Sequence, residues 1–73
     1  MKKPLPTWVR DDNSIVACTE KIKVMTENFE EIQQIMQDAL EDGLLMEVSE
    51  MQMREALLAL VHALKNPYLK QKS

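Results

Sequence analysis

The sequence predicts an all-α protein built as an antiparallel helical hairpin, with helices over about residues 20–42 and 50–65. Two observations lead to this prediction. Apolar residues recur at alternating intervals of three and four through the first range, which is the spacing of one helix face. An almost wholly apolar run covers residues 56–64, after a short connection that contains the only glycine. Helices joined by so short a connection pack side by side in opposite directions.

The first helix is predicted from two interleaved sets of apolar residues, each spaced by seven. Together they form a narrow seam of the kind that packed helices and coiled coils require. They are Ile15, Ile22, Phe29 and Met36, and Cys18, Met25, Ile32 and Ala39. Thr19 is the expected N-cap and Ser14 the alternative, because both side chains can accept a bond from a free backbone N–H. Gly43 is the expected left-handed residue just past the helix end.

The second helix has start and stop signals of its own. Ser49 followed by Gln52 is a capping-box arrangement. Arg54 follows Glu50 by four residues, in the order that favours an ion pair along a helix. Pro67 cannot continue a helix because it lacks a backbone N–H. These signals place the helix over about residues 50–65.

The segments outside the helices are expected to support them. Residues 1–14 form an N-terminal arm, either extended or folded as a short β-hairpin around the turn-forming residues 11–14. Residues 44–48 are mostly apolar and are expected to cover the end of the core. Residues 70–73 form a frayed tail. The whole chain, 1–73, is predicted to be a single small helical domain.

A chain of 73 residues needs reinforcement, because a domain of about this size buries only about 60% of the surface of its unfolded form. Cys18 is the only cysteine and His62 the only histidine, so an internal disulfide and a zinc cluster are excluded. Self-association is the remaining reinforcement. The second helix has more apolar surface than one stripe requires, so two hairpins are predicted to dimerise into a four-helix bundle. The predicted interface consists of Leu57, Leu58, Leu60, Val61 and Leu64.

The composition favours a small non-catalytic protein–protein interaction module, such as an accessory or regulatory subunit. An apolar fraction of 45% and a charged fraction of 29% describe an ordinary globular chain, and the net charge of −3 argues against nucleic acid as a partner. His62 and Cys18 are interpreted as packing residues, so no catalytic residue, cofactor or metal is predicted. The longest apolar run is too short to span a bilayer, and one unpaired thiol suits the predicted cytoplasmic location.

Two charged clusters leave alternatives open. An acidic face, interpreted first as a solvated surface, could instead dock a basic partner or hold a cation loosely. It consists of Asp38, Glu41 and Asp42. A basic end would suit a nucleic-acid-binding regulator, which is the alternative function. It consists of Arg10, Lys65, Lys70 and Lys72. A third hypothesis is a metal- or redox-linked role for the acidic face or for Cys18.

Overall fold

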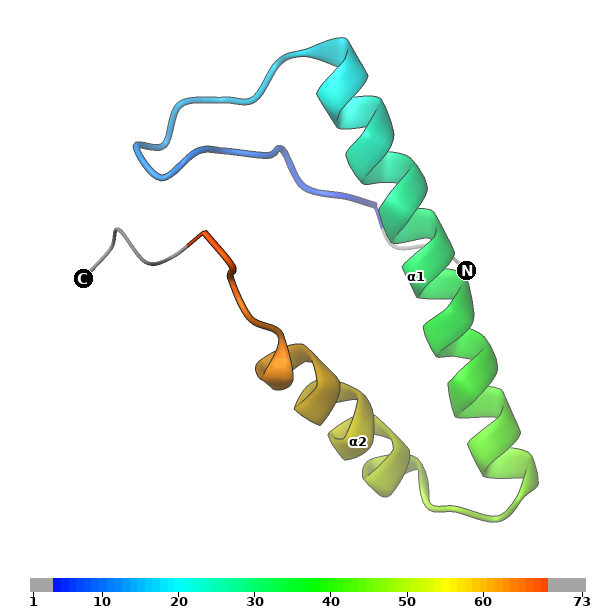
Figure 1. The fold of residues 1–73 in the computed structure, drawn as a ribbon. Coiled ribbons are helices and arrows are strands. Elements are labelled where there is room, and N and C mark those ends of the chain that lie inside the picture. Colours follow the sequence, from blue (N-terminus) through cyan, green and yellow to red (C-terminus); the bar gives the residue numbers. More distant parts are fainter. Residues whose placement is uncertain (1–3, 69–73) are drawn as a thin grey trace. The chain divides into compact units, whose positions relative to one another are not determined.

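The computed structural model describes residues 4–68 and contains two α-helices (Figure 1). Helix α1 spans Thr19–Leu45 and helix α2 spans Glu50–Ala63. No β-strand occurs within the described range, so the prediction of a mostly helical chain is confirmed. The chain divides into two compact units, Met1–Asp38 and Ala39–Ser73. The predicted frayed tail at 70–73 lies outside the described residues.

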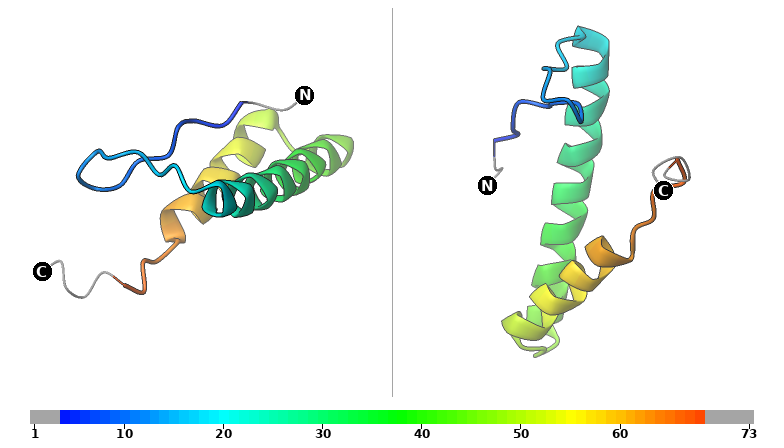
Figure 2. Two further views of the ribbon diagram at one scale, coloured as in Figure 1. Left: turned by 90° about the horizontal axis from the view of Figure 1, so that it is seen from above. Right: turned by 90° about the vertical axis from the view of Figure 1, so that its left-hand side faces the viewer.

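Helix α1 is longer at both ends than the predicted range 20–42, and it runs without interruption (Figure 2). Its N-cap is Cys18, because the Cys18 carbonyl accepts the first intrahelical bond, from the N–H of Ile22, at 3.0 Å. The prediction that Thr19 or Ser14 caps this helix is therefore wrong. Thr19 is the first helical residue, and Ser14 belongs to the preceding loop.

The end of α1 is closed by a different residue from the one predicted. Gly43 lies inside the helix and has no positive φ, whereas Glu47 adopts the left-handed conformation with φ 68°. The N–H of Val48 donates to the carbonyl of Gly43 at 2.9 Å, and the N–H of Glu47 donates to that of Leu44 at 3.0 Å. This pair of bonds is a Schellman motif, which satisfies the last carbonyls of a helix. The helix consequently continues to Leu45.

Gly43 lies directly beneath the side chain of Met53 in α2. A Cβ atom at Gly43 would lie 2.8 Å from Cγ and 2.7 Å from Cε of Met53, which is closer than real Cβ contacts allow. Gly43 is also the one residue in the described range that is classed as buried. The last turn of α1 and the first turns of α2 therefore meet at the corner of a helical hairpin.

Helix α2 begins as predicted and ends two residues early. The Ser49 hydroxyl accepts a bond from the Gln52 N–H at 3.1 Å, which confirms Ser49 as the N-cap. The helix stops at Ala63 rather than Lys65. The carbonyl of Ala63 would need the N–H of residue 67 as its helical partner, and Pro67 has none. Leu64 is accordingly extended, with φ −63° and ψ 145°.

The connection between the helices only partly covers apolar surface. Leu44 and Leu45 belong to α1, and both are exposed, as is Met46. Val48 is half-buried. The prediction that residues 44–48 cover the end of a core is therefore wrong for most of the segment.

The N-terminal segment turns back on itself before α1 begins (Figure 1). One isolated antiparallel bridge joins Val9 to Ile15, in place of a regular pair of strands. At the tip, Asn13 has φ 72°, and Asp12 Oδ1 accepts bonds from the N–H and the hydroxyl of Ser14 at 2.9 and 2.7 Å. The turn-forming residues therefore close the loop locally, as expected of Asx turns.

Candidate interaction surface

Helix α2 carries two kinds of apolar residue. Met53 and Leu57 lie four residues apart on one face and are half-buried, Met53 against Gly43. The rest of the predicted interface is exposed, with exposed fractions of 57% for Leu58, 66% for Leu60, 50% for Val61 and 78% for Leu64. Leu64 lies just beyond the helix, and the other predicted interface residues lie within it. The surface predicted for association is therefore open to solvent in a single chain.

Apolar exposure is not confined to α2. Within the described range no hydrophobic side chain is classed as buried, and large apolar side chains are exposed in both units. In Ala39–Ser73 these include Leu45, Met46 and Met51. A side chain of this size contributes about 1.5–3 kcal/mol of stability when it is fully removed from water. Much of this contribution is missing in the isolated chain.

The N-terminal unit has a groove of its own, which sequence analysis did not identify. The rings of Trp8 and Phe29 lie 5.3 Å apart between centroids, with an interplanar angle of 49°. Beside Trp8, the loop and the first turns of α1 border an apolar groove of about 470 Å³. It is lined by Trp8, Val9, Val16, Glu20, Lys21, Val24 and Met25. The residues on both sides of the 11–14 turn favour β structure, and this is the sequence signal that could have predicted the groove. Their pairing brings Trp8 back onto α1.

Cys18 is exposed at the N-terminus of α1, so its interpretation as a packing residue of the seam is wrong. Hydrogen bonds from the backbone N–H groups of Lys21 and Glu20 lower the pKa of the Cys18 thiol, and the charge of Lys21 adds to this effect. An N-cap side chain faces these N–H groups by construction. The arrangement favours a thiolate, but no base or second nucleophile accompanies it in the described contacts.

The acidic face stays exposed along the C-terminal part of α1. Asp38 Oδ1 accepts a bond from the Gln34 side chain at 2.9 Å, and Glu41 and Asp42 follow at the helical spacing of three and four residues. No group of three or more His, Cys, Asp or Glu residues that could hold a metal ion occurs among the residues that the structure describes. The face is a solvated surface in this structure.

The residues of the predicted basic end have separate environments. The Arg10 guanidinium donates to the Ser14 hydroxyl at 3.2 Å and to the Ile15 carbonyl at 2.9 Å, so it serves the N-terminal loop. Lys65 is exposed just past α2. The remaining two members, Lys70 and Lys72, lie outside the described residues.

Comparison of the chain with protein-family models, with curated proteins and with solved structures gave no match. Between residues 4 and 68, neither helix is both long enough and apolar enough to cross a membrane. Over the same range, residues 4–68, the fold and surface define a helical hairpin with exposed apolar residues on α2.

Proposed function

We propose that the chain is a small, non-catalytic interaction module that works as a homodimer, in the role of an accessory or regulatory subunit. The observation that carries this proposal is the exposure of Leu58, Leu60 and Val61 in α2 and of Leu64 just past it, in a chain without a buried hydrophobic side chain in its described range. A folded chain of this length needs such surface to be covered. A second copy supplies an equal apolar surface at the same concentration.

Two such hairpins would associate as a four-helix bundle through Leu57, Leu58, Leu60, Val61 and Leu64. In this arrangement Met53 stays against Gly43 of its own hairpin, the half-buried Leu57 lies at the edge of the interface, and Leu58 and Val61 are covered by the second copy. The acidic face on α1 remains available as a docking surface for a further protein.

The test is the molar mass of the purified chain, measured by light scattering over a wide range of concentrations. The proposal predicts a dimer that dissociates only on strong dilution. Leu58→Glu places a charge on the covered face of both copies, and loss of two buried leucines weakens association by at least about 100-fold. Gln52→Glu adds the same charge at an exposed position of α2 and serves as the control. A wild-type chain that is monomeric throughout this range contradicts the proposal.

A further inference from the structure

One face of α2 combines exposed apolar residues with a charged residue that is paired on its own helix. Met51, Leu58 and Val61 lie on it, with exposed fractions of 71%, 57% and 50%. Arg54 lies between Met51 and Leu58 at helical spacing, and its Nε donates to Glu50 Oε2 at 2.9 Å. This bond ties the guanidinium to its own helix, so that the apolar stem of Arg54 can extend the face. We call Met51, Arg54, Leu58 and Val61 the outer face.

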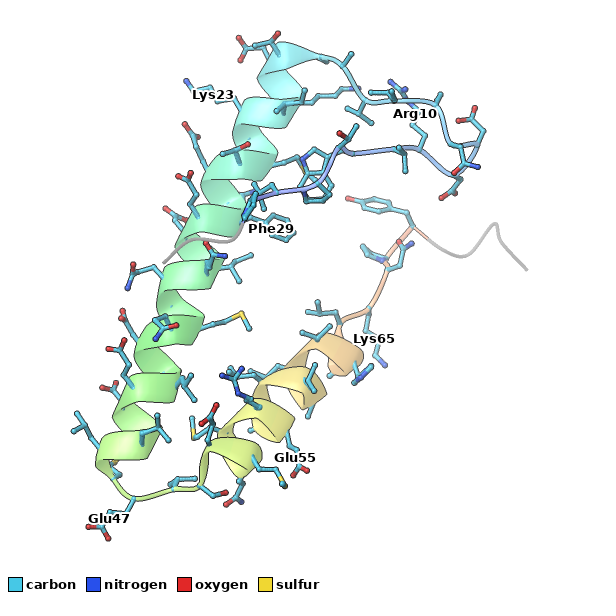
Figure 3. All side chains as sticks on the ribbon, turned by 180° about the vertical axis from the view of Figure 1, so that it is seen from behind. Arg10, Lys23, Phe29, Glu47, Glu55 and Lys65 are labelled. Carbon is cyan, nitrogen blue, oxygen red and sulfur yellow. The ribbon has the colours of Figure 1, made fainter. Side chains whose placement is uncertain are left out.

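The charges that border the outer face are distributed unevenly along α2. At the N-terminal end, Glu50, Arg54 and Glu55 give two negative charges against one positive charge. At the C-terminal end His62 adds an imidazole, and Lys65, two residues past the end of α2, is positive. All five residues are exposed, and Glu55 points from α2 into solvent (Figure 3). One end of the helix is therefore negative and the other positive.

This distribution distinguishes between the two ways in which a second copy can bind. In a parallel pair, like ends lie together, so that Glu55 approaches carboxylates of the second copy and the two Arg54 side chains face each other. In an antiparallel pair, Glu55 of each copy lies beside His62 and Lys65 of the other. The dipoles of the two helices then also oppose each other, which is the favourable arrangement. When Leu58 of one copy packs on Val61 of the other, Arg54 lies level with Lys65 of the other copy, but Arg54 is already paired with Glu50 of its own helix. The attraction between the copies therefore comes from Glu55, which lies beside Lys65 of the second copy only in the antiparallel pair.

We propose that a second copy binds the outer face of α2 in the antiparallel direction, with Glu55 of each copy next to His62 and Lys65 of the other. This inference rests on the proposed function; it centres the interface on Leu58 and Val61 of the outer face and adds the partner's direction and register. A two-fold axis then passes between Leu58 and Val61, so that Leu58 of one copy packs on Val61 of the other. Each charge contact occurs twice, because an isologous interface repeats every pair.

Charge reversal tests this arrangement through the dimer dissociation constant, measured by analytical ultracentrifugation. Glu55→Lys and Lys65→Glu each replace two attractive contacts by two repulsive ones, and each variant is expected to weaken the dimer about tenfold. The double variant restores opposite charges and is expected to return within about threefold of the wild type. Glu47→Lys makes the same change of charge in the exposed turn before α2 and is expected to have little effect.

Crosslinking gives a second measurement that does not depend on affinity. In a Cys18→Ser background, Glu55→Cys and Lys65→Cys are introduced singly and together and treated with a short thiol-specific crosslinker. The antiparallel pair predicts covalent dimer from the double variant and little from either single variant. A parallel pair predicts efficient crosslinking by each single variant.

The outcomes separate this inference from the proposed function. A wild-type dimer in which the charge-reversed double variant is not rescued, or in which single-cysteine variants crosslink, overturns the antiparallel arrangement and leaves the homodimer standing. A monomeric wild type overturns both. Rescue together with double-variant crosslinking supports both.

Discussion

Gly43 leaves the space into which the side chain of Met53 fits, at the corner where α1 meets α2. Glycine within a helix costs about 1 kcal/mol relative to alanine, because its backbone loses more freedom. The close approach of the two elements is what offsets this cost here. Gly43 thus serves packing, while the left-handed turn that ends α1 is made at Glu47.

The first prediction is a coupling between these two residues. In the wild type, Gly43→Ala gains helix propensity, but the new Cβ displaces Met53. In a Met53→Ala background the three atoms nearest to the new Cβ are absent, and the same substitution is expected to raise the free energy of unfolding by about 1 kcal/mol. A double-mutant cycle from chemical denaturation, at fixed chain concentration, measures the coupling. Equal effects of Gly43→Ala in the two backgrounds would show that Met53 does not fill this space.

The second prediction concerns the strained residue of the Schellman motif. The left-handed conformation lowers stability by about 1–2 kcal/mol for a residue with a Cβ atom, and Glu47 adopts it with φ 68°. Glu47→Gly removes this strain and is expected to stabilise the protein by up to about 1 kcal/mol, after the larger entropy of the unfolded glycine is subtracted. The change is measured as a higher midpoint of thermal unfolding. Glu47→Val, which is β-branched, is the control and is expected to lower the midpoint.

The third prediction concerns the aromatic pair that holds the N-terminal loop. Phe29→Ala removes the contact with Trp8, and the loss is expected to be about 1–2 kcal/mol, since neither ring is fully buried. The loop amide of Val16, which donates to the Trp8 carbonyl at 2.9 Å, is expected to exchange its hydrogen faster. Because Trp8 is the only tryptophan, its fluorescence reports the same change. Ile35→Ala, at an α1 residue with an exposed fraction of 67%, is the matched control, and an equal response to it would contradict the assignment.

Local signals in the sequence were sufficient to predict the helices and the start of α2. The Ser49–Gln52 cap and the Glu50–Arg54 pair each depend on residues within one helical turn, and both form as expected. Such features are decided by backbone N–H groups and side chains that are neighbours in the chain. Their prediction needs no knowledge of the rest of the fold.

Some of the features that sequence analysis missed depend on a contact between residues that are distant in the chain. Gly43 carries the usual signal of a helix end, but it lies inside α1 next to Met53, and the left-handed residue is Glu47. Cys18 fits the apolar spacing of the seam, but α1 begins only at Thr19, so Cys18 is the residue before the helix. Likewise, the contact of Trp8 with Phe29 depends on how the loop folds back. The spacing of apolar residues along the chain does not predict these contacts.

The last prediction is the pH dependence that follows from Cys18. The backbone N–H groups of Lys21 and Glu20 lower the pKa of its thiol below the value of an unfolded cysteine, which is about 8.5. Alkylation by iodoacetamide is therefore expected to reach half its maximal rate at lower pH in the folded chain than in urea. Because the folded pKa is the lower one, the stabilising contribution of the thiolate is fully present above the unfolded pKa. It is lost as the pH falls through the folded pKa. Cys18→Ser keeps an N-cap side chain and is expected to abolish this dependence, whereas equal alkylation midpoints in the folded and urea-unfolded chains would contradict the cap geometry.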